Sequence, residues 1–384
     1  MAVGELFQIF RDGRARTKSE LAALTGMSRN TVSARVDALI AADLLTGAGS
    51  EASSGGRPPA RVAMNPGAGT VLAIDLGATH ASVAVTDLAA SILDFETVSM
   101  EIGRGPHFVL DTVFEMGERL LAGSGKQERL MGIGIGLPGA VEHATGRPIN
   151  PPIMPGWDRF DVPSYVRQRF NAPVLVDNDV NILALGEHAL SWPDADDLIF
   201  VKVATGLGSG IIAGGRLQRG AQGIAGDIGH VQVPFSADSP RAPDDERTLG
   251  SISSGMAIAQ SLSSAGLTAN DAHDVVSLIQ QADPRAVAAT RQAGKELGEV
   301  LATLVNTLNP SVIVLGGSIA HAGEHLLAGV REVVYRRSIP LATRDLVIVQ
   351  SRGGDRAGVL GAAILVVQQA LSVAGVEGIV ANAA

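Results

Sequence analysis

The stretch VLAIDLGATH, residues 71–80, decides the fold of this chain. Its apolar first half predicts a buried strand over Val71–Leu76, and the glycine-containing turn that follows leads into a second predicted strand, Ala81–Thr86. The same arrangement returns at TGLGSG, residues 205–210, between predicted strands Leu198–Ala204 and Gly210–Ala213. A strand-turn-strand unit that occurs twice predicts a duplicated α/β fold with a cleft between its halves.

Both turns combine glycine with threonine, a composition suited to phosphate. Glycine has no β-carbon, so backbone amides can approach phosphate oxygens closely, and threonine hydroxyls add donors. Asp75 could hold a metal ion through water. The steric demands of a tight hairpin turn would also explain the glycines. A later predicted strand, Val312–Leu315, ends in paired glycines suited to a nucleotide. The candidate nucleotide-binding residues are Asp75, Gly77, Thr79, Thr205, Gly206, Gly316 and Gly317.

The first 66 residues predict two helices joined by a tight turn. Thr17 and Glu20 have the form of a capping box, so a helix should start there. Gly26 is placed to end it in the left-handed conformation, and Ser28 caps a second helix that runs to about Ala42. The apolar positions expected to face inward are Leu21, Ala22, Leu24, Val32, Val36, Leu39 and Ile40. This unit predicts a helix-turn-helix whose second helix enters the major groove of DNA.

The second predicted helix carries side chains able to reach base edges or phosphates. A predicted strand at Leu44–Thr46, a Gly/Ser-rich stretch over 47–56 and a returning strand toward Met64 would form a wing. Arg57, in a Gly-Arg-Pro triplet, resembles an arginine presented to the minor groove by an AT-hook. The alternatives are a hairpin with a solvated polar face and a loop that only links. The candidate DNA-binding residues are Ser28, Arg29, Asn30, Thr31, Ser33, Arg35 and Arg57.

Charge is distributed unevenly along the chain. Residues 1–66 carry eight Arg/Lys and six Asp/Glu, a net charge of +2, whereas the remainder carries −11. We therefore expect nucleic acid to contact only the head. There is no cysteine, which excludes disulfides and thiolate metal sites. Apolar runs stay far below the roughly 18 residues that cross a bilayer, so we expect a cytoplasmic protein without a signal peptide or a membrane partner.

Further segments follow in a fixed order: GIGLPG at 134–139, DNDVN at 177–181 and GDIGH at 226–230. Together with the two turns, they resemble the ROK family (repressor, open reading frame, kinase). The resemblance implies an actin-like (ribonuclease H-like) sugar-kinase fold. In a family kinase, Asp179 would be the general base that takes the proton of the sugar hydroxyl. Asp179 could also be only a helix cap or a surface residue. The residues implied to bind sugar are Gly139, Asn178, Asp179, Asp227 and His230.

The chain departs from the family kinases in several places. Residues 231–249 hold none of the cysteines that bind zinc in those kinases, so the family zinc site should be absent, and we expect no other metal there. Gly250 stands where the kinases have a sugar-binding glutamate, and Asp227 where they usually have glutamate. Ala78 replaces the second glycine of the first phosphate turn. Sugar affinity should therefore differ from the kinases, and nucleotide binding is in question.

These departures favour a ROK-family transcriptional regulator, a repressor of carbohydrate-metabolism genes, over an enzyme. It would bind operator DNA, sense a sugar or sugar phosphate in the cleft, and act as a homodimer or homotetramer. The alternative is an active ATP-dependent sugar kinase, similar to a glucokinase, that carries a DNA-binding head and uses ATP and magnesium. The expected domains are the winged head over 1–66, a first actin-like subdomain over 67–188, completed by a C-terminal helix over 370–384, and a second over 189–369.

Overall fold

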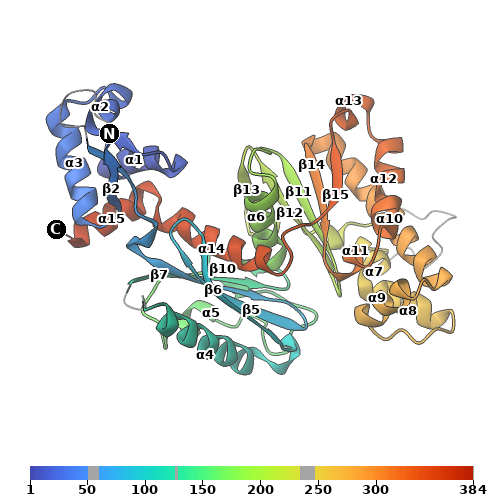
Figure 1. Ribbon diagram of the computed structural model, residues 1–384. Coiled ribbons are helices and arrows are strands. Elements are labelled where there is room, and N and C mark those ends of the chain that lie inside the picture. Colours follow the sequence, from blue (N-terminus) through green and yellow to red (C-terminus); the bar gives the residue numbers. More distant parts are fainter. Residues whose placement is uncertain (51–59, 126–128, 234–246, 384) are drawn as a thin grey trace.

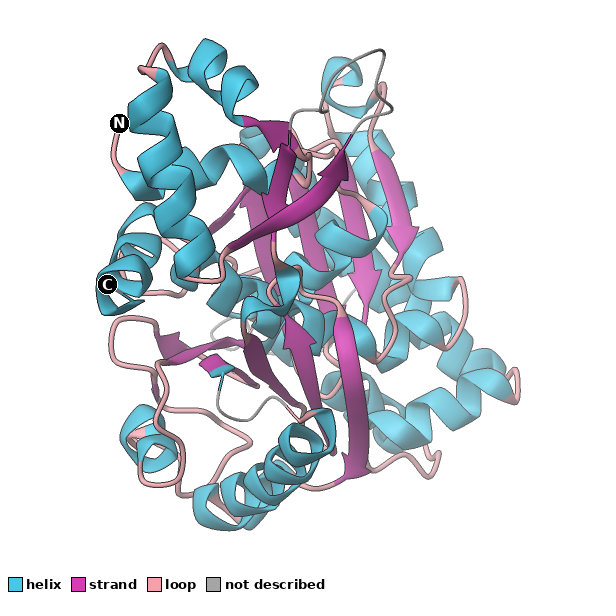
Figure 2. Cartoon of the chain, turned by 60° about the vertical axis from the view of Figure 1, so that its left-hand side comes forward, coloured by secondary structure: helices cyan, strands magenta, loops and turns pink. Residues whose placement is uncertain are grey.

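The computed structural model describes residues 1–50, 60–125, 129–233 and 247–383. A small N-terminal head is followed by two lobes, each built on a five-stranded sheet (Figure 1). Both chain ends lie at the head in the two views (Figures 1 and 2). The α/β class and the duplication predicted from the two glycine-containing turns are confirmed.

The head combines three helices with a three-stranded sheet of order β1-β3-β2. Its elements are α1 (Val3–Gln8), a 3-10 turn (Ile9–Asp12), β1 (Arg16–Thr17), α2 (Lys18–Thr25), α3 (Arg29–Ala41), β2 (Leu45–Ser50) and β3 (Ala60–Met64). The predicted capping box is present, because the Thr17 hydroxyl accepts from the Glu20 amide at 3.1 Å and the Glu20 carboxylate accepts from the Thr17 amide at 2.6 Å. Gly26 takes the left-handed conformation, with φ of 70°, and Ser28 caps α3.

Two of the apolar positions expected inside the head are exposed. Leu24 is 63% exposed and Ile40 is 42% exposed, so the prediction was wrong for both. Helix α2 is short and buries only Leu21. Ile40 lies about 100° around α3 from the buried Leu39, outside the buried stripe of Val32, Val36 and Leu39. Arg57 lies outside the described residues.

The first lobe is a sheet of order β10-β7-β4-β5-β6. Its strands are β4 (Thr70–Leu76), β5 (His80–Asp87), β6 (Ile92–Ser99), β7 (Leu130–Leu137) and β10 (Val174–Asn178). Strands β10, β7 and β4 run parallel, and β5 and β6 are antiparallel to their neighbours. Helix α4 (Pro106–Ser124) packs on β5 and β6, α5 (Val162–Arg167) packs beside β10, and the short hairpin of β8 (Val141–Glu142) and β9 (Arg147–Pro148) lies beside β10.

The second lobe repeats this topology in the order β13-β12-β11-β14-β15. Its strands are β11 (Leu198–Val203), β12 (Leu207–Ala213), β13 (Arg216–Gln218), β14 (Val312–Gly316) and β15 (Val347–Gln350). In each lobe the first strand lies in the centre, two antiparallel strands follow on one side and two parallel strands on the other. The helices of the second lobe are α7 (Leu249–Ser253), α8 (Gly255–Ser264), α9 (Ala272–Gln280), α10 (Pro284–Leu308), α11 (Ser318–His321), α12 (His325–Arg337) and α13 (Pro340–Thr343).

Two helices fill the layer between the sheets. Helix α6 (Asp179–Ser191) packs on β11 and β12 of the second lobe, and α14 (Arg356–Ala370) packs on β4 and β7 of the first. The two helices contact each other through glycines: a β-carbon on Gly186 would lie 1.8 Å from the Ala357 carbonyl oxygen, and one on Gly361 would lie 1.7 Å from that of Ile182. Only glycine permits so close an approach of two helix backbones.

The packing at the C-terminus differs from the expected domain division. Helix α14 falls inside the range expected for the second subdomain, yet it covers the first sheet. The helix expected to complete the first subdomain, α15 (Val373–Ala383), packs against α1 and α3 of the head. The reason is that α1 has an apolar face, which α15 covers and shields from solvent.

Among the described residues, no single helix is long and apolar enough to cross a membrane. Helices α14 and α15 together are long and apolar enough, but the pair is bent by 67°.

Candidate ligand-binding cleft

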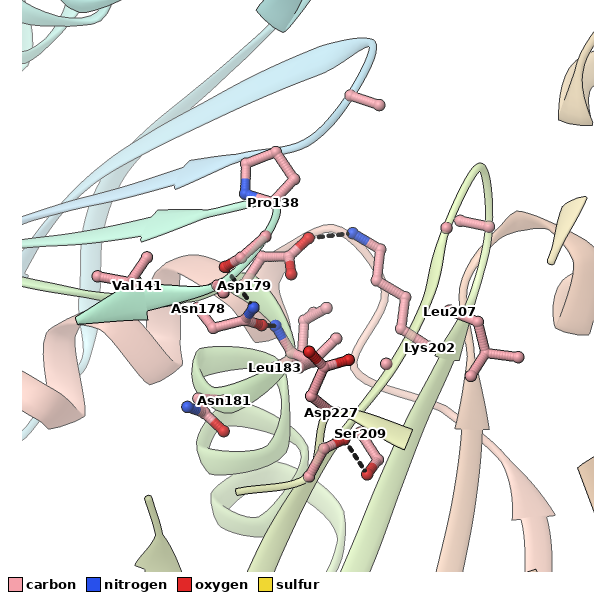
Figure 3. Close-up of a pocket in the computed structure, with 18 of the residues that line it drawn as sticks. Pro138, Val141, Asn178, Asp179, Asn181, Leu183, Lys202, Leu207, Ser209 and Asp227 are labelled. Carbon is pink, nitrogen blue, oxygen red and sulfur yellow. Dashed lines mark hydrogen bonds and ion pairs between the residues drawn. The ribbon is translucent and has the colours of Figure 1, made fainter. Parts of the chain in front are cut away.

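A cavity of about 1350 Å³ opens between the lobes. Its walls come from the turn after β4, the segment after β7, the beginning of α6, the turn between β11 and β12, and the loop before the 3-10 turn Ile228–His230. The five residues that the family resemblance implies for sugar all border it: Gly139, Asn178, Asp179, Asp227 and His230. Figure 3 shows several of these side chains around the open space.

Asp179 occupies the first position of α6 and is buried. Asn178 precedes it as the helix cap: its Oδ1 accepts from the Val180 amide at 2.8 Å, and its Nδ2 donates to the Gly139 carbonyl at 2.5 Å. These two bonds fix the start of α6 against the segment after β7. The Asp179 carboxylate is therefore held at a defined place on the cavity wall, with Oδ2 accepting from Lys202 Nζ at 2.5 Å (Figure 3).

The alternation of β11 aims Lys202 at that carboxylate. Val201 belongs to the core beneath the helices of the second lobe, whereas Phe200 belongs to the cluster that includes α6. Lys202 is two residues beyond Phe200 and so lies on the face toward α6. Its cross-strand neighbours are Gly208 and Gly316, which have no side chains to compete for the space. The side chain of Lys202 can therefore extend from β11 to Asp179 without a clash with a side chain of either neighbouring strand.

Lys202 remains charged although its side chain is only 18% exposed. Burial disfavours the ammonium form, but the nearby carboxylates of Asp179 and Asp75 outweigh this and raise the pKa of Lys202 above its ordinary value. The side chains of Lys202 and Asp179 are only 18% and 6% exposed. Their ion pair is therefore weakly screened by solvent.

Asp75 lies at the end of β4, on the face covered by α14, and is 6% exposed. A β-carbon on Gly358 of α14 would lie 1.9 Å from its Oδ2, so the helix packs directly on the carboxyl group. Burial raises the pKa of Asp75 to about 7; the charges of Asp179 and Asp355 act in the same direction, and that of Lys202 opposes them. Asp75 is thus divided between its protonated and ionised forms near neutral pH.

In the turn between β4 and β5, the His80 ring lies beside the Gly77 backbone. The Gly77 amide donates to the His80 carbonyl at 2.9 Å, and a β-carbon on Gly77 would lie 2.2 Å from His80 Cε1. Burial lowers the pKa of His80, and the charge of Lys202 lowers it further, which favours the neutral imidazole. Gly77 itself does not border the cavity, whereas Asp75 and Thr79 do.

Packing explains two more of the candidate glycines. A β-carbon on Gly316 would lie 2.6 Å from Cζ of Phe200, and one on Gly317 would lie 2.4 Å from the Val203 carbonyl oxygen. Both glycines are therefore required by the contact of β14 with β11, independently of any ligand. Gly316 does not border the cavity; Gly317, Thr205 and Gly206 do, and the space beside Gly206 is open.

Asp227 and His230 pair with each other on the cavity rim. His230 Nδ1 lies 2.9 Å from Asp227 Oδ2, and the histidine side chain is 84% exposed. Asp227 precedes the 3-10 turn Ile228–His230 and His230 ends it, so one turn of helix brings the two side chains together. Among the described residues, no group of three or more His, Asp or Glu side chains is arranged to hold a metal ion.

Two features of the cleft were missed from the sequence. Lys202 was not among the candidates, although a single charged residue in an otherwise apolar strand is a signal that could have found it. Asp177 was also missed: its carboxylate accepts from Arg219 Nε and from Asn181 Nδ2, each at 2.7 Å. This network ties the loop after β13 to the beginning of α6, and so positions the rim of the cavity.

In the head, the candidate DNA-binding side chains fall into two groups. Arg29 and Asn30 are exposed at the N-terminal end of α3. Ser28 and Thr31 are engaged in capping that helix, with their hydroxyls 2.8 Å apart. The N-terminal end of α3 is therefore the part of the helix that presents unengaged polar groups outward.

The remaining candidates on α3 are partly engaged inside the head. Ser33 accepts from Lys18 Nζ at 2.8 Å and donates to Asp37 at 3.1 Å. Arg35 contacts the sulfur of Met27. Contact with DNA through Ser33 or Arg35 would require these side chains to leave their present partners.

Two lobes of one topology around a cleft, with a small helical head attached, define an actin-like sugar-kinase fold with an added N-terminal unit. The chain belongs to the ROK family, whose model matches residues 71–369. It is 30% identical over 376 residues to the xylose repressor of Caldicellulosiruptor bescii, covering 94% of each chain. It is 30% identical over 316 residues to the glucokinase of Halalkalibacterium halodurans, covering 77% of this chain and 94% of that enzyme.

Among solved structures, a ROK family transcriptional regulator described as a homologue of the E. coli MLC protein superposes with a TM-score of 0.80 at 24% identity. The superposition covers 99% of this chain and 98% of that one. This chain, head included, therefore shares its fold with that structure over nearly its whole length.

Proposed function

We propose that this protein is a ROK-family transcriptional repressor that binds operator DNA through its head and is regulated by a sugar in the cleft. The observation that carries the proposal is the extent of the likeness: the xylose repressor aligns over 94% of this chain, whereas the glucokinase aligns over 77%. The protein would act in the cytoplasm as a two-fold dimer, because a helix-turn-helix normally reads two half-sites.

The charges of the cavity favour a neutral sugar over a sugar phosphate. Its lining includes the acidic residues Asp75, Glu142, Asp179, Asp227 and Asp355 and the basic residues Arg147, Arg159 and Lys202. Arg147 and Lys202 are engaged in ion pairs with Asp161 and Asp179. An excess of carboxylates repels phosphate but accepts hydrogen bonds from sugar hydroxyls. Because a relative that matches over 94% of this chain is a xylose repressor, xylose is the first effector to test.

A continuous path of contacts supports communication between cleft and head. Gly358 near the beginning of α14 packs on Asp75 in the cavity wall. At the other end of α14, the Leu371 carbonyl accepts from Gln8 of α1 at 2.8 Å, and Gly4 of α1 packs on the Val373 carbonyl. A movement of α14 on sugar binding would therefore reach the head directly, and the sugar would shift operator affinity to the extent that it binds the two arrangements differently.

The test is fluorescence anisotropy of the full chain on DNA from the promoter of its own gene, with and without xylose and a panel of other neutral sugars. We expect binding that falls steeply with salt and is weakened by the effector. Arg29→Ala should weaken binding, and Arg104→Ala on the body serves as the charge-matched control. Equal affinity of both variants and the wild type would refute the role of the head.

A second candidate function, ATP-dependent sugar phosphorylation, is favoured by Asp179, Thr205 and Gly206, which border the same cavity. Incubation with ATP, magnesium and the same sugars, followed by measurement of ADP, decides between the two. Turnover that Asp179→Asn abolishes would establish the kinase; we expect none above background.

A further inference from the structure

The kinase fold implies magnesium and a nucleotide, and the residues of this cleft can be tested against that requirement. Phosphoryl transfer to a sugar needs a carboxylate that is free to accept the proton of the attacking hydroxyl. It also needs carboxylate oxygens available to the metal or to its bound waters. In the described cleft, Asp179 and Asp75 are the carboxylates in the corresponding positions.

Both carboxylates already interact with other groups of the protein. Asp179 Oδ2 already accepts a hydrogen bond from the Lys202 ammonium at 2.5 Å, and the two side chains are 6% and 18% exposed. Asp75 is covered by α14, with Gly358 packed on its Oδ2, and interacts electrostatically with the same lysine. A magnesium ion near these groups would have to displace or tolerate a buried positive charge, which is strongly repulsive at such short range.

The phosphate turn gives an independent indication in the same direction. The His80 ring lies against Gly77, on the side where a β-carbon would be, and Ala78 adds a methyl group next to it. The His80 ring thus occupies the space beside the Gly77 backbone, and His80 and Ala78 both border the cavity. The described cleft does not fit a magnesium–nucleotide complex.

We propose that Lys202 is a built-in counter-ion that takes the place of the divalent cation: its ammonium pairs with Asp179 and lies near Asp75, so that the cleft binds a neutral polyhydroxyl ligand without metal or nucleotide. Three placements make this possible. The alternation of β11 points Lys202 at α6, the flanking Gly208 and Gly316 leave its path open, and the cap at Asn178 fixes Asp179 opposite. Lys202 is a positioning residue, since it holds Asp179 as an acceptor for ligand hydroxyls.

The experiment follows a metal directly, so it does not depend on the identity of the sugar. Mn²⁺ is titrated into the full-length protein and free Mn²⁺ is measured by electron paramagnetic resonance. The variants are Lys202→Met, which keeps a similar length without charge, the double variant Lys202→Met with Asp179→Asn, and Lys295→Met. Lys295 lies on α10, does not border the cavity and pairs with Glu332, so its replacement is the matched control.

We expect the wild type and Lys295→Met to show the same weak Mn²⁺ binding. Removal of a unit charge about 4 Å from the cation should tighten binding in Lys202→Met by about 100-fold, and Asp179→Asn should abolish that gain. A folded Lys202→Met variant without a gain would overturn the proposal. So would stoichiometric Mn²⁺ binding by the wild type that Asp179→Asn removes, a result that needs no lysine variant to fold.

A second measurement separates this inference from the proposed function. Binding of the effector sugar to the wild type is compared in EDTA and in magnesium plus ATP, and we expect equal affinity. Affinity that depends on the metal would contradict the role of Lys202 while leaving the repressor function standing. Failure of every sugar to bind, with the manganese results as expected, would count against the proposed effector only.

Discussion

Replacement of Asp75 by asparagine should stabilise the protein, and the gain should grow with pH. The substitution keeps the size of the side chain but removes its ionisation. In the folded wild type, burial raises the pKa of Asp75 from 3.8 to about 7. The folded state therefore binds the proton more tightly than the unfolded state, and the unfolding free energy falls as pH rises between these two values.

The magnitude follows from the size of that shift. About 3 pKa units at about 1.4 kcal/mol each correspond to roughly 4 kcal/mol, present below pH 4 and lost above pH 7. The Asp75→Asn variant does not lose this stability as pH rises, because asparagine does not ionise. Its advantage over the wild type should thus be small near pH 4 and approach about 4 kcal/mol near pH 8.

The assay is urea denaturation at several pH values between about 4 and 8, followed by tryptophan fluorescence. Trp157 reports on the first lobe, because it is fully buried and its Nε1 donates to the Ile102 carbonyl at 3.2 Å. Asp94→Asn, an exposed position on β6, is the control and should follow the wild type at every pH. A difference between Asp75→Asn and wild type that does not change with pH would refute the reasoning.

Three further predictions concern the head and the path from the cleft. Arg29→Ala should weaken operator binding by about 1–3 kcal/mol if it contacts a base, and a reduced salt slope without loss of sequence preference would assign it to phosphate instead. Gly4→Ala should lower the unfolding free energy by about 1–3 kcal/mol and increase hydrogen exchange in α15, because its β-carbon would lie 2.2 Å from the Val373 carbonyl oxygen. Gly378→Ala is the control and should do neither, because the space beside Gly378 is open. Glu187→Gln should lower the unfolding free energy by about 1.5–3 kcal/mol and weaken the response of DNA binding to sugar, since Glu187 is fully buried and accepts from the backbone amides of Arg352 and Gly353 just before α14. An unchanged thermal midpoint in Glu187→Gln would contradict that assignment.

The order of the motifs in the sequence predicted much of the cleft. The segments at 134–139, 177–181 and 226–230 lie far apart in the chain, and their resemblance to the ROK family implied a common site. The structure places all five implied sugar residues on one cavity. It gives other reasons for Gly77 and Gly316, which pack against His80 and Phe200 and do not border that cavity.

The sequence alone determined the features that depend on a few neighbouring residues. The capping box at Thr17 and Glu20, the left-handed turn at Gly26 and the buried strand over 71–76 are all local, because their hydrogen bonds and sterics are satisfied within one turn or one strand. Tertiary structure alone decided that Lys202 of one lobe reaches Asp179 beside the other, and that α15 covers the head. These contacts join segments whose distance in space is fixed by the packing of two sheets and the helices between them, and no local pattern encodes that distance.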